Sequence, residues 1–281
     1  MSLKTFVKWP GNKSKYMKYI VPNVPEEFNR YIEPFVGSGA LLLKLKPTKW
    51  IINDLNKDLI NCWKHVMNDP EHIIAGFKKF GKKFKRLSLE KKKEMCKKLT
   101  AGISSMDYDI NRAIRFLLMK YCAYMGNISI KNENKFSGLD SNIYVKNRCF
   151  FLEPNSFKNL LDVSEFLNTT KGKIYNLDYK KILSKAKIGD FVFLDPPYIE
   201  DHDYDFDYNN DHKTEKTDSF LKSLRDELKK LDKKGVKWMM TQAETPEVKR
   251  IFSGYKIIKF KVYRYFSNTY KNELIIKNFT E

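Results

Sequence analysis

The segment Phe191–Tyr198 carries the residues best suited to chemistry. Its first half, Phe191-Val192-Phe193-Leu194, predicts a buried parallel strand, and Asp195-Pro196-Pro197-Tyr198 follows at once. The two prolines end the strand and fix the backbone, so the Asp195 carboxylate and the Pro196 carbonyl project together at the carboxyl edge of the sheet. Such a pair can accept both N–H bonds of an amino group on a flat base while Tyr198 stacks on that base. The alternative is an ordinary strand end followed by a Pro-Pro turn.

A glycine-containing turn and a second carboxylate lie near the N-terminus. Phe35-Val36-Gly37-Ser38-Gly39 lies between a predicted strand and a predicted helix, where glycines let the backbone approach a ligand closely. Leu42 stands where a dinucleotide fingerprint would have a third small residue, which disfavours a pyrophosphate cradle. Asp54 follows the predicted strand at 50–52 and is placed like an acid that binds ribose hydroxyls, although it could instead cap the next helix. The pattern predicts a nucleoside site without a pyrophosphate.

The elements that must position these residues alternate along the chain. Strands are predicted at 31–35, 50–52, 173–175, 191–194 and 236–240, with a C-terminal hairpin formed by 255–266 and 272–278. Helical spacing is seen at 78–99, 110–124 and 218–231. The alternation favours an α/β fold, with a parallel sheet covered by helices on both faces. We predict a catalytic domain made of residues 1–60 and 169–281, interrupted by an inserted helical domain, residues 61–168.

Composition points to a polyanionic partner. The 281 residues are 42% hydrophobic, which excludes a disordered chain, and they carry a net charge of +19. Lysine accounts for most of the cations, which suits sequence-independent phosphate attraction better than bidentate recognition of guanine. Solubility and the codon bias of an AT-rich genome are the alternative explanation. The scattered cysteines disfavour zinc and disulfides, and the lack of a signal segment or an apolar span predicts a soluble, intracellular protein.

Four motifs in order support a family resemblance. Lys8-Trp9-Pro10-Gly11-Asn12-Lys13-Ser14-Lys15, Tyr31–Gly39, Asn53-Asp54 and Asp195–Tyr198 resemble the Dam-like DNA adenine N6-methyltransferases of the alpha group, and so do Arg264 and Asn272–Asn278. The resemblance covers roughly residues 4–60 and 172–281. It implies a Rossmann-like S-adenosylmethionine methyltransferase sheet with an inserted helical target-recognition domain. It also implies S-adenosylmethionine as methyl donor, no required metal, double-stranded DNA as partner, and a possible cognate restriction endonuclease that acts separately.

The same resemblance assigns roles to individual residues. It places Trp9 and Lys13 beside the methionine end of the cofactor, with the backbone of Phe35, Gly37, Ser38 and Gly39 under that portion, Asp54 on the ribose and Asp178 on the cofactor adenine. Asp178 could equally be a helix N-cap. Asp195, Pro196, Pro197 and Tyr198 would be the catalytic motif. The target adenine would be flipped out of the duplex, and its N6 would attack the methyl group in line.

The chain departs from the family mainly in the insert. Met125–Ile130 and Asn134–Gly138 replace the family's Asn-Gly-Leu and Arg/Asn/Gly-bearing loop, so a target sequence cannot be transferred. Thr241-Gln242 replaces the usual Ser-Asn pair. Candidate DNA contacts are Arg112, Arg115, Lys135 and Arg148, the arginines as guanine-binding residues. The alternative for Arg112 and Arg115 is that they only solvate the surface of their helix. The basic stretch 78–99 is expected to dock on phosphates, the alternative being a solvated helix face.

An acidic segment and three competing functions complete the predictions. Residues 200–211 alternate Asp with aromatic residues, but Phe206 and His212 stand where an EF-hand needs Gly and Glu, so we predict a mobile loop whose Phe206 or Tyr208 closes on the flipped base. DNA adenine methylation is the leading function. The alternatives are methylation of RNA adenine or of cytosine N4, and a catalytically inactive subunit that binds nucleic acid.

Overall fold

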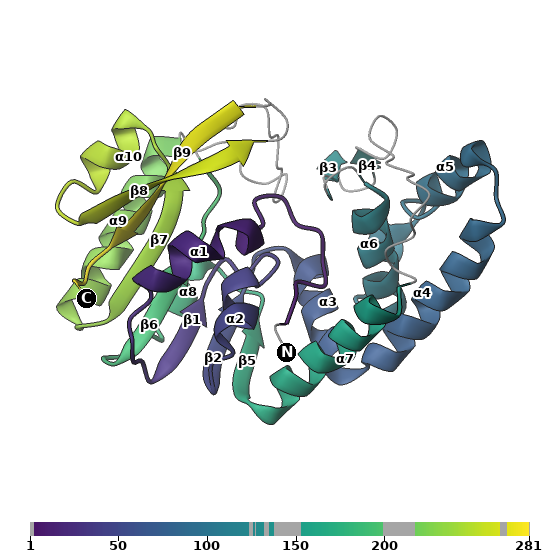
Figure 1. The fold of residues 1–281 in the computed structure, drawn as a ribbon, viewed down its shortest axis with the longest axis horizontal. Coiled ribbons are helices and arrows are strands. Elements are labelled where there is room, and N and C mark those ends of the chain that lie inside the picture. The colour runs from purple at the N-terminus through teal and green to yellow at the C-terminus, as the bar shows by residue number, and fades with distance from the viewer. Residues whose placement is uncertain are drawn as a thin grey trace.

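A seven-stranded sheet forms the centre of the molecule in the computed structural model, which describes residues 3–123, 126, 128–131, 135–137, 153–198, 217–264 and 269–280 (Figure 1). The strands are β1 (Arg30–Glu33), β2 (Lys49–Asn53), β5 (Lys171–Tyr175), β6 (Asp190–Leu194), β7 (Lys237–Ala243), β8 (Lys256–Arg264) and β9 (Thr269–Lys277). Their order in the sheet is β5-β2-β1-β6-β7-β9-β8. The first five are parallel, and β9 runs antiparallel to both β7 and β8. The predicted α/β class is therefore confirmed.

The strand order reverses beside β1. From β1 the chain builds outward through β2 and β5 on one side, whereas β6 and β7 lie on the other. Ligands of open α/β sheets bind in the crevice outside the carboxyl ends of the strands at such a point. The residues at this point are Glu33 at the end of β1 and Asp195 directly after β6. The Tyr31–Gly39 and Asp195–Tyr198 motifs therefore meet at the carboxyl edge of the sheet.

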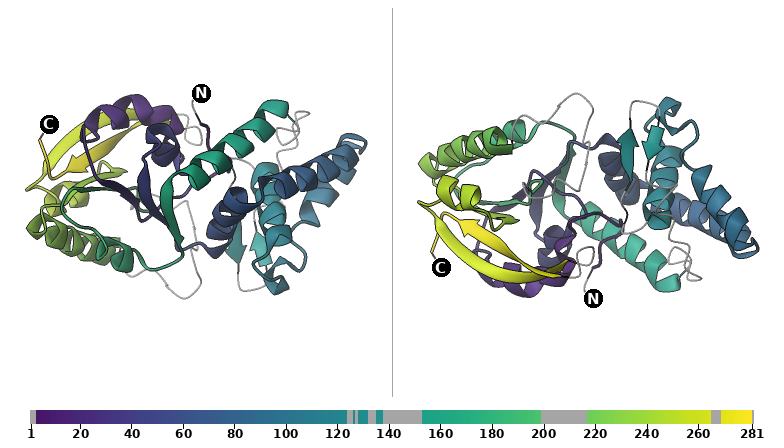
Figure 2. Two further views of the ribbon diagram at one scale, coloured as in Figure 1. Left: turned by 90° about the horizontal axis from the view of Figure 1, so that it is seen from below. Right: turned by 90° about the horizontal axis from the view of Figure 1, so that it is seen from above.

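Helices cover both faces of the sheet (Figure 2). Strand side chains alternate between two buried clusters, since Tyr31 and Phe191 point to one face and Ile32 and Val192 to the other. The first face packs against α1 (Met17–Ile20), α2 (Ala40–Leu45), α3 (Lys57–Asn68) and α7 (Pro154–Thr169). The second packs against α8 (Tyr179–Leu183), α9 (Thr217–Lys233) and α10 (Pro246–Ile251). Short 3-10 helices are η1 (Lys13–Tyr16), η2 (Val21–Asn23) and η3 (Ile103–Ser105).

The middle of the chain extends beyond the β5 edge of the sheet (Figure 1). It contains α4 (Pro70–Lys85), α5 (Leu89–Lys97), α6 (Ile110–Cys122) and a hairpin of β3 (Ser129–Lys131) and β4 (Lys135–Ser137). The expected single helix at 78–99 is wrong, because the chain leaves α4 at Arg86 and Ser88 caps α5 by accepting the Lys91 N–H at 3.4 Å.

The predicted domain boundary between residues 60 and 61 falls inside α3. One buried cluster contains Phe77 and Leu117 of the insert together with Tyr31 of β1, so the hydrophobic core is continuous across that boundary. Among the helices of the described residues, none is both long and apolar enough to span a bilayer.

Candidate active site

Asp195 is the meeting point of residues from distant parts of the chain. Its Oδ1 accepts a hydrogen bond from the Thr241 hydroxyl at 2.7 Å and lies 2.9 Å from Lys13 Nζ. Thr241 comes from β7, and Lys13 opens η1 with its side chain 6% exposed. Asp195 itself keeps 21% of its side chain exposed. One carboxylate oxygen is therefore fixed from two sides, and the group still reaches solvent.

Tyr198 is held by a second carboxylate. Its hydroxyl donates to Glu273 Oε2 at 2.8 Å, and Glu273 lies on β9 with 4% exposure. Pro196 is buried, and the Pro197 carbonyl accepts from Gln242 Nε2 at 3.5 Å. Both members of the Thr241-Gln242 pair thus contact the Asp195–Tyr198 segment. The hydrogen bond to Glu273 fixes the orientation of the aromatic ring next to Asp195.

The contacts of the Lys13 ammonium indicate which kind of group fits between Asp195 and the Tyr198 ring. Its ammonium lies 4.6 Å from the centre of the Tyr198 ring, contacts Asp195, and donates to the Gly11 carbonyl at 2.9 Å. A nitrogen that donates to Asp195 above the Tyr198 ring makes two of the contacts predicted for a base amino group. The geometry therefore suits an N–H donor beside an aromatic face.

The glycine-containing turn is shaped by two tryptophans. Gly37 has φ +46°, and a Cβ added there would lie 2.9 Å from Trp9 Cδ1. Gly39 has φ +66°, and its added Cβ would lie 2.5 Å from Trp63 Cζ2. Trp63 also donates its indole N–H to the Gly37 carbonyl at 3.2 Å. The glycines are needed for this close packing, which brings Trp9 against the turn.

Asp54 holds the turn from the neighbouring strand. Its Oδ2 accepts the Gly37 N–H and its Oδ1 accepts the Asn56 N–H, each at 3.0 Å. Burial raises the Asp54 pKa to about 6, although both backbone hydrogen bonds oppose this shift. The N-cap of α3 is Asn56, which accepts from Leu59 N–H, so the helix-cap alternative for Asp54 does not hold.

Glu33 is a third carboxylate at the same edge, and sequence analysis gave it no role. It ends β1 with 2% exposure and accepts the Tyr31 hydroxyl at 2.8 Å. Burial raises its pKa well above the usual range, and the nearby charges of Asp195 and Asp54 raise it further. The signal that could have found Glu33 is a carboxylate at the end of a buried strand, just before a glycine-containing turn.

These carboxylates provide a test of whether the predicted cofactor fits. Glu33, Asp54 and Asp195 lie close enough to influence one another, and the first two are buried. A cation bound here would lower the raised pKa values of Glu33 and Asp54 and favour their ionised forms, so the crevice favours a positively charged ligand. S-adenosylmethionine carries a sulfonium and an ammonium, so the charge of this crevice fits that molecule.

Asp178 has the position of a helix cap. Its carboxylate accepts the Lys180 N–H at 2.8 Å as the N-cap of α8, and its side chain is exposed. The preceding residue, Leu177, is tied to Asn53 by two hydrogen bonds of 2.8 and 2.9 Å. Asp178 therefore lies at the carboxyl edge of β5, and its role toward the cofactor stays a prediction.

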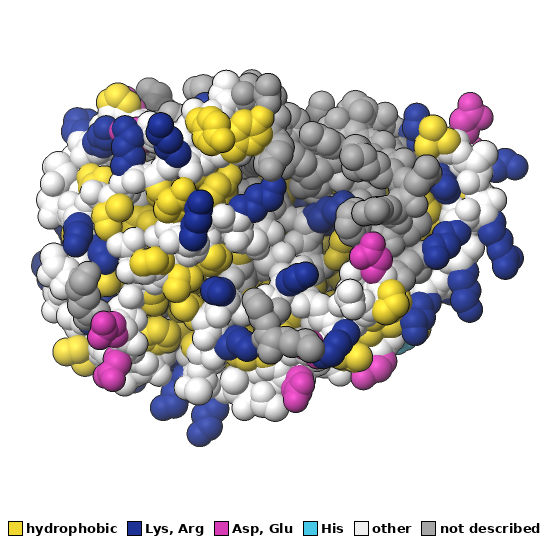
Figure 3. Space-filling model, in the orientation of Figure 1, with side chains coloured by type: hydrophobic (Ala, Val, Ile, Leu, Met, Phe, Trp, Pro, Cys, Tyr) yellow, Lys and Arg dark blue, Asp and Glu magenta, His cyan; other side chains and the backbone are white. Residues whose placement is uncertain are grey.

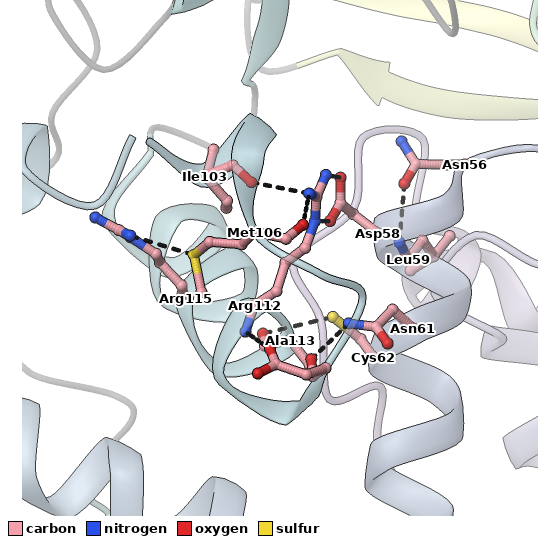
Figure 4. Close-up of polar contacts among 11 residues, drawn as sticks. Asn56, Asp58, Leu59, Asn61, Cys62, Ile103, Met106, Arg112, Ala113 and Arg115 are labelled. Atoms are coloured by element: carbon pink, nitrogen blue, oxygen red, sulfur yellow. Dashed lines mark hydrogen bonds and ion pairs between the residues drawn. The ribbon is translucent and has the colours of Figure 1, made fainter. Parts of the chain in front are cut away.

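Arg112 points toward Asp58 in the protein interior, whereas Arg115 reaches away from that pair toward Met106 (Figure 4). The Arg112 guanidinium is paired with Asp58, with Nε to Oδ1 at 2.6 Å and Nη2 to Oδ2 at 3.1 Å, and its Nη1 donates to the Ile103 and Met106 carbonyls. Arg112 is 5% exposed. Its geometry does not fit the expected contact with guanine, because the donors that would bind a base are engaged inside the protein.

Of the other predicted DNA contacts, Arg115 is fully described, Lys135 only by its backbone, and Arg148 not at all. Arg115 Nη2 donates to the Lys98 carbonyl at 2.7 Å. Lys135 lies in β4, its side chain not being among those described, and Arg148, Phe206 and Tyr208 fall outside the described residues. Exposed cations gather on α4 and α5, at the end of the molecule where dark blue side chains cluster in Figure 3. They are Lys78, Lys79, Lys82, Lys83, Lys85, Lys91, Lys93 and Lys97.

Across the part of the chain that the structure describes, no three His, Cys, Asp or Glu side chains gather as metal ligands would. The mixed sheet, with β9 antiparallel between β7 and β8, agrees with the Rossmann-like sheet that the family resemblance implies. Its switch point carries Asp195, the predicted acceptor for an amino group. Fold and site together define a methyltransferase.

Comparison with known proteins gives the family. The model of the D12 class N6 adenine-specific DNA methyltransferases matches residues 9–265, and the chain belongs to this family. It is 29% identical over 276 residues to the type II methyltransferase M1.LlaDCHI of Lactococcus lactis, covering 94% of this chain and 89% of that one. It is 30% identical over 279 residues to the type II methyltransferase M.MjaIII of Methanocaldococcus jannaschii, covering 92% and 91%. The Dam-like resemblance is thus confirmed: the protein is an adenine-specific DNA methyltransferase from an S-adenosylmethionine-dependent family.

Proposed function

We propose that the protein methylates N6 of an adenine that is flipped out of duplex DNA at a specific sequence. The Lys13 ammonium carries this proposal, because it already lies on Asp195 and over the Tyr198 ring. The amino group of a flipped adenine would take over these contacts as Lys13 withdraws. A free ammonium and a base amino group both donate hydrogen bonds, but only the base brings a flat ring to stack on Tyr198.

The chain's own residues orient the reacting nitrogen. Asp195 and the Pro196 carbonyl accept the two N6 hydrogens, which directs the nitrogen lone pair away from them. Thr241 fixes the Asp195 carboxylate, and Glu273 fixes the Tyr198 ring. The acceptors also stabilise the positive charge that develops on N6. S-adenosylmethionine, when bound, supplies the electrophilic methyl group.

We assign the cofactor to the crevice next to this pocket. Trp9, Lys13 and the backbone of 35–39 would lie at the methionine portion, and Asp54 at the ribose. Glu33 would accept a cationic group of the cofactor, which relieves the burial of its charge. Asp178 would contact the cofactor adenine from the start of α8. The support for these roles is that Glu33, residues 35–39, Asp54 and Asp178 lie at or just after the carboxyl ends of β1, β2 and β5, and that Trp9 packs on Gly37.

DNA docking is assigned to the insert. The exposed lysines of α4 and α5 supply positive charge that suits a phosphate backbone. Target recognition is assigned to the region around the β3–β4 hairpin and not to Arg112, which is buried. Two relatives are named type II methyltransferases, so we include a cognate restriction endonuclease, acting separately, in the proposal.

The test is methyl transfer from labelled S-adenosylmethionine to duplex DNA, single-stranded DNA and RNA, followed by digestion to nucleosides. We expect label in N6-methyldeoxyadenosine from the duplex and, after sequencing, at one recurring site. Asp195→Ala should retain cofactor binding and lose transfer. Asp226→Ala is the matched control, since Asp226 is an exposed residue of α9 paired with Arg225. Label in N4-methylcytosine or RNA, or full activity of Asp195→Ala, would contradict the proposal.

A further inference from the structure

Lys120 is a buried cation that the assigned mechanism does not use. It lies near the end of α6 and is 4% exposed. Its Nζ donates to the Gly126 carbonyl at 3.0 Å and lies 4.2 Å from the centre of the Trp9 ring. Keeping a lysine ammonium out of water is unfavourable unless its environment compensates for lost hydration. The contacts of Lys120 therefore call for an explanation beyond core packing.

One side of Lys120 faces the assigned cofactor crevice. The Trp9 ring, which the ammonium contacts, packs against Gly37, where an added Cβ would lie 2.9 Å from Trp9 Cδ1. The Gly37 N–H donates to Asp54, and the Asp54 charge in turn favours the charged form of Lys120. Lys120 thus interacts with the ring and the carboxylate that flank the glycine-containing turn.

The other side of Lys120 faces the start of the recognition hairpin. Gly126 has φ +74°, and an added Cβ would lie 2.5 Å from the Lys8 carbonyl oxygen, so this residue is packed tightly on the N-terminal segment. β3 begins shortly after it, at Ser129. The carbonyl that Lys120 holds therefore lies shortly before the start of β3 in the chain.

Further hydrogen bonds tie the N-terminal segment to the same end of α6. Lys8 Nζ donates to the Tyr121 carbonyl at 3.1 Å, and the Tyr121 hydroxyl donates to the Phe6 carbonyl at 2.9 Å. Trp9 follows directly on this segment. Hydrogen bonds and the ring contact with Lys120 therefore link Trp9 and its neighbours to the end of α6 and to Gly126.

We propose that Lys120 is a positioning residue that couples cofactor binding to DNA binding. Its ammonium holds Trp9 and the Gly126 carbonyl in one arrangement, so a cofactor that orders Trp9 also orders the base of the β3–β4 hairpin. Coupling between two binding sites is reciprocal, so DNA on the hairpin strengthens cofactor binding by the same factor. The inference rests on the cofactor and DNA sites assigned above.

The protonation of Lys120 gives the coupling a pH dependence. Burial lowers the Lys120 pKa to about 7, against the opposing effects of Cys62, Asp58 and Asp54. Arg112 neutralises Asp58, and Lys8, the other cation near Gly126, directs its ammonium to the Tyr121 carbonyl. The ammonium is present below pH 7 and is lost as the pH rises above it. Coupling should therefore be stronger at pH 6.5 than at pH 8.5.

The experiment measures the dissociation constant of a duplex oligonucleotide carrying the mapped target site, with and without S-adenosylhomocysteine. For the wild-type protein we expect S-adenosylhomocysteine to tighten DNA binding about fivefold or more at pH 6.5. For Lys120→Met the ratio should fall to within about twofold of one. Lys120→Arg, which keeps a cation, should restore part of the ratio. Lys64→Met, an exposed residue of α3, is the control and should match the wild type.

An undiminished ratio in Lys120→Met would overturn the inference, and so would a wild-type ratio of one while methyl transfer proceeds. The second result would leave the proposed function standing. Failure of the wild type to transfer methyl or to bind S-adenosylhomocysteine would instead refute the proposed function. If Lys120→Met does not fold, the wild-type ratio at pH 6.5 and 8.5 decides, and a ratio that does not fall at the higher pH overturns the inference.

Discussion

Replacing Arg112 tests whether this arginine supports the insert or contacts DNA. Arg112→Met leaves the Asp58 carboxylate buried without its bidentate partner and removes the donor to two carbonyls. Breaking a buried ion pair from one side costs about 3–5 kcal/mol of folding free energy. Since each kcal/mol lowers the melting temperature of a protein of this size by roughly 2–4 °C, we expect a decrease of about 6–20 °C.

Thermal unfolding followed by tryptophan fluorescence measures this change, with two further variants as controls. Arg225→Met breaks an exposed pair with Asp226, which contributes only about 0–1 kcal/mol. The double variant Asp58→Leu/Arg112→Met removes both buried charges and should recover at least about half of the lost stability. An Arg112→Met protein that melts within about 2 °C of the wild type but no longer discriminates among target sequences would refute the structural role and restore the guanine contact.

Three further predictions concern the crevice. Tyr198→Phe keeps the ring but removes the hydrogen bond to Glu273. We expect kcat to fall about tenfold with little change in DNA affinity. An unchanged single-turnover rate would contradict this prediction. Gly39→Ala would put a Cβ 2.5 Å from Trp63 Cζ2 at φ +66°, so urea denaturation should show a loss of about 2–4 kcal/mol. A loss under about 1 kcal/mol would mean that the turn can relax. Because the Asp54 pKa is about 6, protonation should weaken S-adenosylhomocysteine binding about tenfold between pH 7.5 and pH 5. Calorimetry should show this pH dependence disappear in Asp54→Asn, and its persistence would point to another group.

The strands were predictable because their patterns are local. Phe191–Leu194 is a continuous apolar run, as expected for a strand buried on both faces, and β6 occupies Asp190–Leu194. The break between α4 and α5 was missed because apolar residues continue at helical spacing through it. Ser88 was the available signal, since a serine before Leu89 and Glu90 is typical of a helix N-terminus.

The partners of the site residues were not predictable, because they depend on distant pairing. Glu273 reaches Tyr198 from 75 residues away, only because β9 inserts between β7 and β8. Arg112 lies on a helix whose sequence does not reveal which face meets Asp58, 54 residues earlier. Motif residues such as Asp195 and Asp54 were predictable because their place at strand ends follows from the local sequence alone.

The continuous core across α3 limits how this enzyme can acquire a new target sequence. Trp63 of α3 packs on Gly39 of the glycine-containing turn, while the same helix contacts α6 and α7. A chimera that took residues 61–168 from a relative would replace Trp63, whereas Gly39 and the turn that packs against it would stay. The packing would then be poor on both sides of the junction. Segments that begin after Gly126 can be exchanged without cutting α3 or α6. New specificities are therefore expected to arise by substitutions in and after the hairpin, and not by the shuffling of whole modules.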